Sequence, residues 1–68
     1  MFDEIFLFVK LAETKSIKET AQSLDISNST VTRSIQKLEA ELNIKLFKAH
    51  AHHFDLTADG QKIYDHFV

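Results

Sequence analysis

The sequence predicts a mainly α-helical fold of the winged helix-turn-helix class: three helices, a β-hairpin wing and then a C-terminal helix. Three observations support this prediction. The chain has no proline and one glycine, which favours helices with short joints. Apolar residues recur at helical spacing in four segments. One short alternating segment, IKLFK at 44–48, lies between the third and the fourth of these helices. We therefore expect one domain over residues 1–68.

The first helix is expected over residues 3–13. Ile5, Phe8, Val9 and Ala12 recur at spacings that place them on one face, which we expect to be the core face. Additional apolar residues widen this stripe, which indicates either deep burial or contact with a partner chain. These residues are Phe2, Phe6, Leu7 and Leu11.

The second helix begins after Ser16, a good N-cap, and Glu19 lies at the position that completes a capping box. It runs to about Leu24 and places Ala21 at a close helix crossing. Residues 25–26 then form a turn, with Ile26 as a buried residue. Together with the next helix, this gives the two-helix unit of a helix-turn-helix.

The third helix is capped by Ser27 and ends before Asn43, a residue that tolerates the left-handed conformation common at helix ends. Its core stripe is expected to comprise Val31, Ile35, Leu38 and Leu42. Strands over 44–48 and 54–57 follow, joined by a loop at 49–53. Thr57 then caps a fourth helix, whose apolar side contains Ile63, Tyr64 and Phe67.

Charge is distributed unevenly along the chain, although the net charge is −2. Residues 27–53 hold four basic and two acidic side chains, whereas both flanking segments have an excess of two acids. The positive middle segment is the part expected to face phosphates. The absence of cysteine excludes disulfides and thiolate metal sites. No apolar run reaches membrane-spanning length, so we expect a cytoplasmic, nucleoid-associated protein with no membrane partner.

The third helix carries a polar face opposite its core stripe. Asn28, Ser29, Thr32, Arg33 and Gln36 share this face, and no acid precedes Glu39 on the helix. Solvated faces are usually rich in Glu and Lys, whereas Asn, Gln and Arg can contact base edges in the major groove of DNA. We therefore expect base contacts from this face. The phosphate contacts are expected from Ser16, Lys18, Ser27, Thr30, Lys37, Lys45 and Lys48.

A family resemblance adds to this interpretation. It is carried by Phe8-Val9, by Ser16-Ile17 and Thr20-Ala21, by residues 27–35 and 37–39, by Leu46-Phe47, and by Leu56-Thr57-Ala58-Asp59-Gly60. With these motifs at gapless spacing, the whole chain resembles the N-terminal DNA-binding domain of LysR-type transcriptional regulators.

The resemblance implies sequence-specific binding of double-stranded DNA for transcription regulation, with no enzyme activity, no cofactor and no metal. It also implies a dimer, usually within a tetramer. The apolar excess of the first helix and the apolar stripe of the C-terminal helix are the surfaces through which we expect a homodimer. The family's linker helix and effector domain are absent from this sequence, so an effector ligand is expected only if a further C-terminal domain exists.

Two departures from the family pattern concern DNA contacts. The family often has Gln-Pro where this chain has Asn28-Ser29, and it usually has an arginine at the position of Ala49. The wing here carries His50, His52 and His53 instead. These histidines could bind a metal, but zinc sites usually draw their ligands from separated elements, so a solvated loop is the simpler interpretation.

Two other function classes have weaker support. Asp55, Asp59 and Asp65 lie near His53 and His66 in the sequence, but no phosphate loop or nucleophile motif accompanies them, so an enzyme is not expected. A winged-helix protein-interaction module without strong DNA binding is the alternative. The net negative charge and the apolar excess of the first helix support it.

The histidine-rich wing predicts a pH effect. An unperturbed histidine has a pKa of about 6.5, so acidification adds positive charge beside the phosphates. We expect nonspecific DNA affinity to rise between about pH 7.5 and pH 6, with a steeper salt dependence at the lower pH. Binding isotherms at both pH values and several salt concentrations measure this, and equal salt slopes would contradict it.

Overall fold

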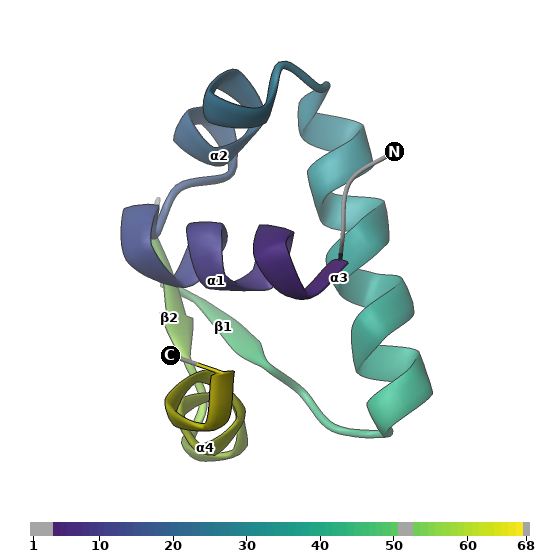
Figure 1. Ribbon diagram of the computed structural model, residues 1–68, viewed down its shortest axis with the longest axis vertical. Helices are drawn as coiled ribbons and strands as arrows, with labels where there is room; N and C mark the ends of the chain where they lie inside the picture. Colours follow the sequence, from purple (N-terminus) through teal and green to yellow (C-terminus); the bar gives the residue numbers. More distant parts are fainter. Residues whose placement is uncertain (1–3, 51–52, 68) are drawn as a thin grey trace.

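The computed structural model describes residues 4–50 and 53–67, except for the side chain of His50. Its elements, in order, are α1 (Glu4–Thr14), α2 (Ile17–Leu24), α3 (Asn28–Leu42), β1 (Phe47–His50), β2 (His53–Leu56) and α4 (Ala58–Phe67). This order confirms the predicted winged helix-turn-helix. Figure 1 shows α1 crossing the long helix α3 near its middle, with α2 on one side of α1 and the hairpin with α4 on the other.

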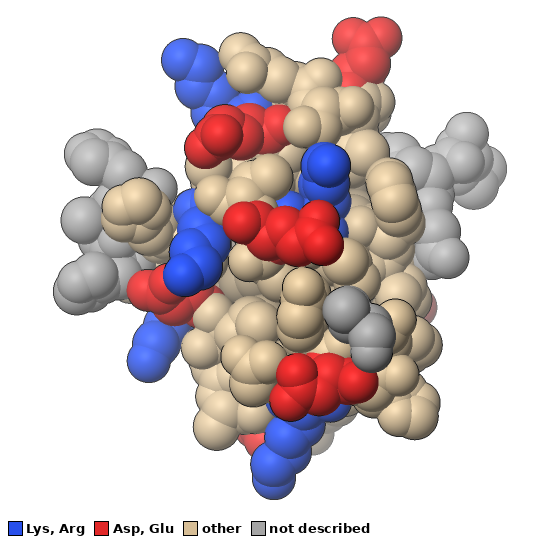
Figure 2. Space-filling view, turned by 60° about the vertical axis from the view of Figure 1, so that its left-hand side comes forward, with Lys and Arg blue, Asp and Glu red and all other residues tan. Residues whose placement is uncertain are grey.

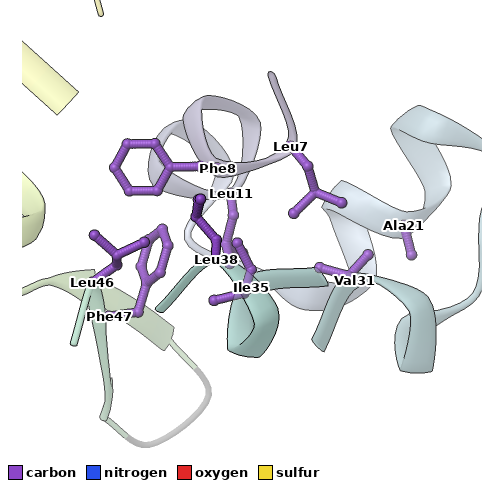
Figure 3. Close-up of a cluster of buried hydrophobic side chains, with 9 residues drawn as sticks. All are labelled: Leu7, Phe8, Leu11, Ala21, Val31, Ile35, Leu38, Leu46 and Phe47. Carbon is purple, nitrogen blue, oxygen red and sulfur yellow. The ribbon is translucent and has the colours of Figure 1, made fainter. Parts of the chain in front are cut away.

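The hydrophobic core gathers around α1, as Figure 3 shows. Within α1, the fully buried residues are Leu7, Phe8 and Leu11, whereas Ile5 and Val9 are only partly buried. The predicted core face of α1 is therefore rotated from the real one. The reason is that α1 packs against α2, α3, β2 and α4, so its apolar surface is wide and spacing alone does not fix the centre. The rest of the buried core consists of Ala21, Val31, Ile35, Leu38, Leu46 and Phe47.

The core stripe of α3 is confirmed at Val31, Ile35 and Leu38 but not at Leu42, which is 41% exposed. Because α1 crosses near the middle of α3, the last turn of α3 extends beyond the elements that cover the stripe (Figure 1). The helix then ends as predicted, at Asn43 in the left-handed conformation with a φ of 56°.

Two serine caps are confirmed. The Ser16 hydroxyl accepts from the Glu19 N–H at 3.1 Å, and the Ser27 hydroxyl accepts from the Thr30 N–H at 3.1 Å. The capping box predicted at α2 is wrong, because the Ser16 N–H donates instead to the Thr14 hydroxyl at 3.2 Å. A neighbouring threonine from the end of α1 thus takes the position expected of the Glu19 carboxylate.

The hairpin is antiparallel, and its register pairs Phe47 with Leu56 and His50 with His53. The bounds predicted for both strands are wrong, and the predicted loop at 49–53 largely belongs to the strands. Residues 44–46 instead form the connection from α3, in which Leu46 is fully buried and its N–H bonds a side chain of α3. Backbone pairing therefore starts at Phe47.

The start of α4 packs tightly against the root of β1. The Thr57 hydroxyl caps α4 as predicted, accepting from the Gly60 N–H at 2.9 Å, and the Thr57 N–H donates to the Leu46 carbonyl at 3.0 Å. Gly60 is buried, and a Cβ atom there would lie 2.2 Å from the Leu46 carbonyl oxygen. This contact is with backbone, so only glycine fits without a shift of α4.

We predict that Gly60→Ala lowers the free energy of unfolding by about 1–3 kcal/mol, the usual cost of overpacking. Urea unfolding followed by circular dichroism measures this. Asp59→Ala, at the neighbouring exposed position, is the control and should change stability much less. If Gly60→Ala and the wild type had equal free energies of unfolding, α4 would be able to shift away from the Leu46 carbonyl without cost, and the prediction would be wrong.

Candidate nucleic-acid interface

The polar residues predicted on α3 form one continuous surface. Asn28, Ser29, Thr32, Arg33 and Gln36 are all exposed, and together they line one shallow hollow. We call this surface the recognition face. It lies opposite the buried stripe of the same helix, so packing of the stripe against α1 and α2 points the recognition face outward.

The recognition face carries one positive charge and no negative one. Among the described residues, Arg33 has no ion-pair partner, so its guanidinium is available to a ligand. The first turn of α3 contains no acid, and the first acid along the helix, Glu39, is directed toward the hairpin root. A face with this composition favours contact with an electronegative, hydrogen-bonding surface.

The N-terminus of α3 is held in place by the turn that precedes it. Asp25 adopts the left-handed conformation with a φ of 57°, and the Ile26 N–H donates to the Ala21 carbonyl at 3.0 Å. Ile26 is only partly buried, less than expected. The hydroxyls of Ser27 and Thr30 lie 2.8 Å apart and bond each other. These two residues, predicted to contact phosphates, therefore already serve as the helix cap.

The four lysines predicted to contact phosphates differ in their surroundings. Lys18 on α2 and Lys48 on β1 are exposed. Lys37 lies 3.5 Å from a Glu4 carboxylate oxygen, and Lys45 lies 3.8 Å from Glu39. Both of these lysines are also exposed, and ion pairs at the surface contribute little stability, so either lysine can turn to another partner. Lys37 lies on the α1 side of α3, whereas Lys45 lies at the hairpin root.

The wing, which is the hairpin of β1 and β2, exposes a histidine on one strand and an alanine on the other. His53 and Ala49 are exposed, while the side chain of His50 and the whole of His52 lie outside the described residues. No group of three metal-ligating side chains occurs in the described part of the chain. A second hollow separates α3 from the hairpin, with Thr32 and Gln36 at one edge and Ala49 at the other.

Charges outside α3 are mixed rather than segregated. Figure 2 shows acidic side chains next to basic ones over the face it displays, with no continuous basic surface among the described residues there. No helix in the described ranges has the length and apolar character needed to cross a bilayer. Two of the four basic side chains in the positive middle segment, Lys37 and Lys45, lie beside acidic side chains rather than in a broad basic patch.

Sequence reasoning missed the part played by Glu39. The sequence shows this residue only as the acid that ends the polar face, yet its carboxylate bonds two backbone N–H groups at the start of β1. Its position beside Leu38 of the core stripe is the only signal in the sequence that it is turned inward.

Comparison with known proteins identifies the domain. Residues 2–61 match the family model described as bacterial regulatory helix-turn-helix protein, lysR family. The chain belongs to the LysR family. It is a LysR-type DNA-binding domain of a transcription regulator and not an enzyme.

Related proteins agree with this assignment. The probable HTH-type transcriptional regulator SinR of Salmonella typhimurium is 38% identical over 85% of this chain and 18% of its own length. The DNA-binding domain of CbnR, solved in complex with DNA, has a TM-score of 0.88 and 28% identity, covering 93% of this chain and 72% of that one. The BenM DNA-binding domain, solved in complex with catB site 1 DNA, has a TM-score of 0.87 and 30% identity, covering 93% of this chain and 68% of that one. The chain spans about a fifth of the length of the curated relatives it matches.

We predict that Ser27→Ala lowers the free energy of unfolding by about 1 kcal/mol, because the Thr30 N–H loses its acceptor. Ser27→Asn supplies another acceptor and should stay close to the wild type. Thermal unfolding of the three proteins measures the difference. Identical midpoints for Ser27→Ala and the wild type would mean that the cap does not stabilise α3.

Proposed function

We propose that this LysR-type domain reads specific double-stranded DNA sites with the N-terminal half of α3 in the major groove. The observation that supports this most strongly is the exposed, acid-free recognition face at a capped helix N-terminus. In this arrangement Asn28 and Gln36 pair with adenine, Arg33 pairs with guanine, and Ser29 and Thr32 contact bases or nearby phosphates.

The surrounding residues would contact the DNA backbone. The N-terminal amides of α3 favour a phosphate, and the exposed lysines add permanent positive charge. The hairpin would lie along the minor groove, where His53 supplies hydrogen bonds in place of the family's arginine. The proposed backbone contacts are Ser16, Lys18, Ser27, Thr30, Lys37, Lys45 and Lys48.

The oligomeric state, the location in the cell and the effector are also proposals. Phe6 on α1 and Phe67 on α4 are 54% and 51% exposed, which supports a homodimer through these two helices. Membership of a regulator family supports a cytoplasmic, nucleoid-associated location. An effector would act only through a further C-terminal domain.

The decisive experiment is selection of bound sites from random duplex DNA, followed by affinity measurements at several salt concentrations. A recovered consensus with a steep loss of affinity at high salt supports the proposal. Absence of binding to any duplex at low salt would contradict it and favour a protein-interaction module instead.

We predict that Arg33→Ala costs about 1–3 kcal/mol of discrimination at one base pair of the selected site, because the guanidinium no longer makes a bidentate pair with guanine. A base-by-base binding profile measures this. Arg33→Lys keeps the charge without the planar fork, so it should lose the same discrimination but retain the salt slope. An unchanged profile for Arg33→Ala would show that this side chain does not read a base.

A further inference from the structure

Glu39 connects the helix that carries the recognition face to the root of the wing. Its side chain is 11% exposed. One carboxylate oxygen, Oε2, accepts from the Leu46 N–H at 2.8 Å and from the Phe47 N–H at 3.3 Å. The other, Oε1, lies 3.8 Å from the Lys45 ammonium. A single side chain of α3 therefore contacts three successive residues that lead into β1.

The two backbone donors have few alternatives. Leu46 is fully buried and Phe47 is 7% exposed, so water has little access to their N–H groups. A buried N–H without a partner is costly, and a carboxylate is a stronger acceptor than a neutral oxygen. The bonds from Glu39 therefore favour one placement of the hairpin root relative to α3.

The hairpin has a second attachment on its other strand. The Phe54 N–H of β2 donates to the Lys15 carbonyl at 3.0 Å, in the turn between α1 and α2. This bond fixes the hairpin to the body of the domain, but not to α3. Of these two attachments, only the one through Glu39 links the wing directly to the recognition helix. Glu39 lies one helical turn beyond Gln36, the last residue of the recognition face.

We propose that Glu39 is a positioning residue for DNA binding, which sets the separation between the wing and α3 so that both can contact one duplex. The Lys45 ammonium lies 3.8 Å from the same carboxylate, at the hairpin root. The inference rests on the proposed function, because it assigns a role within that interface to a side chain that does not itself contact DNA.

Amide hydrogen exchange in the 68-residue chain without DNA tests the attachment itself. Glu39→Ala should speed exchange at Leu46 and Phe47 by about tenfold, as expected when a hydrogen bond to a charged group is removed. Glu39→Gln keeps an acceptor oxygen and should restore most of the protection. Glu41→Gln, at an exposed position on the same helix, is the matched control and should match the wild type.

Hydroxyl-radical footprinting and salt titration on a selected duplex test the role in binding. Glu39→Ala should abolish protection where the wing meets the DNA, and the slope of log affinity against log salt should fall by about 0.9 for each phosphate that the wing no longer neutralises. The base-by-base profile of positions read by α3 should not change. Glu39→Gln should recover the wing footprint.

Two results of the DNA-binding experiments would overturn the proposal. One is a wing footprint in Glu39→Ala equal to that of the wild type. The other is a proportional weakening of every DNA contact, including base readout, because Glu39 would then only stabilise the fold. A wild-type chain that binds no duplex would contradict the proposed function instead, and unchanged amide exchange in Glu39→Ala would separately contradict the attachment.

Discussion

The packing of Phe8 is the interaction on which the rest of this domain depends. Its ring is fully buried and meets Phe47 of β1 edge-on at a centroid distance of 5.5 Å and Tyr64 of α4 at 6.4 Å. One side chain of α1 thus joins the hairpin and the last helix to the three-helix body. A chain of this size buries only about 60% of its unfolded surface, so few such contacts are available to replace it.

This packing explains how a small domain can hold the polar side of α3 toward solvent without disulfides. Packing of α1 across α3 buries one side of α3 and leaves the polar side exposed. A threonine pair strengthens the joint between α1 and α2, since the hydroxyl of the fully buried Thr20 lies 2.7 Å from the hydroxyl of Thr14. The recognition face is therefore placed by core contacts on the opposite side of its own helix.

The sequence predicted several features that depend on neighbouring residues, although the capping box at Ser16 was wrong because Thr14 bonds the Ser16 N–H. Ser27 and Asn43 were placed correctly because a cap and a left-handed helix end are chosen by local backbone geometry. The polar face of α3 followed from helical period alone. The functional use of that face, base by base, stays a prediction.

Features that depend on distant partners were not predictable from spacing. The centre of the α1 core face depends on the four other elements that pack against α1. The Leu46 and Phe47 N–H groups at the start of β1 bond the Glu39 carboxylate of the preceding helix. The ion pair between Lys37 and Glu4 likewise requires α1 and α3 to cross at one place. These contacts join residues that do not belong to the same helix or strand, so the spacing of residues within one element does not reveal them.

The backbone at Lys15 has a consequence for sequence variation. Lys15 is exposed, and by exposure alone any residue would be tolerated there. Its φ of 60°, however, lies in the left-handed region, which β-branched residues rarely adopt. Relatives and designed variants of this domain should therefore accept glycine, asparagine or aspartate at this surface position far more readily than valine or isoleucine. At this joint, tolerance to substitution follows backbone conformation rather than solvent exposure.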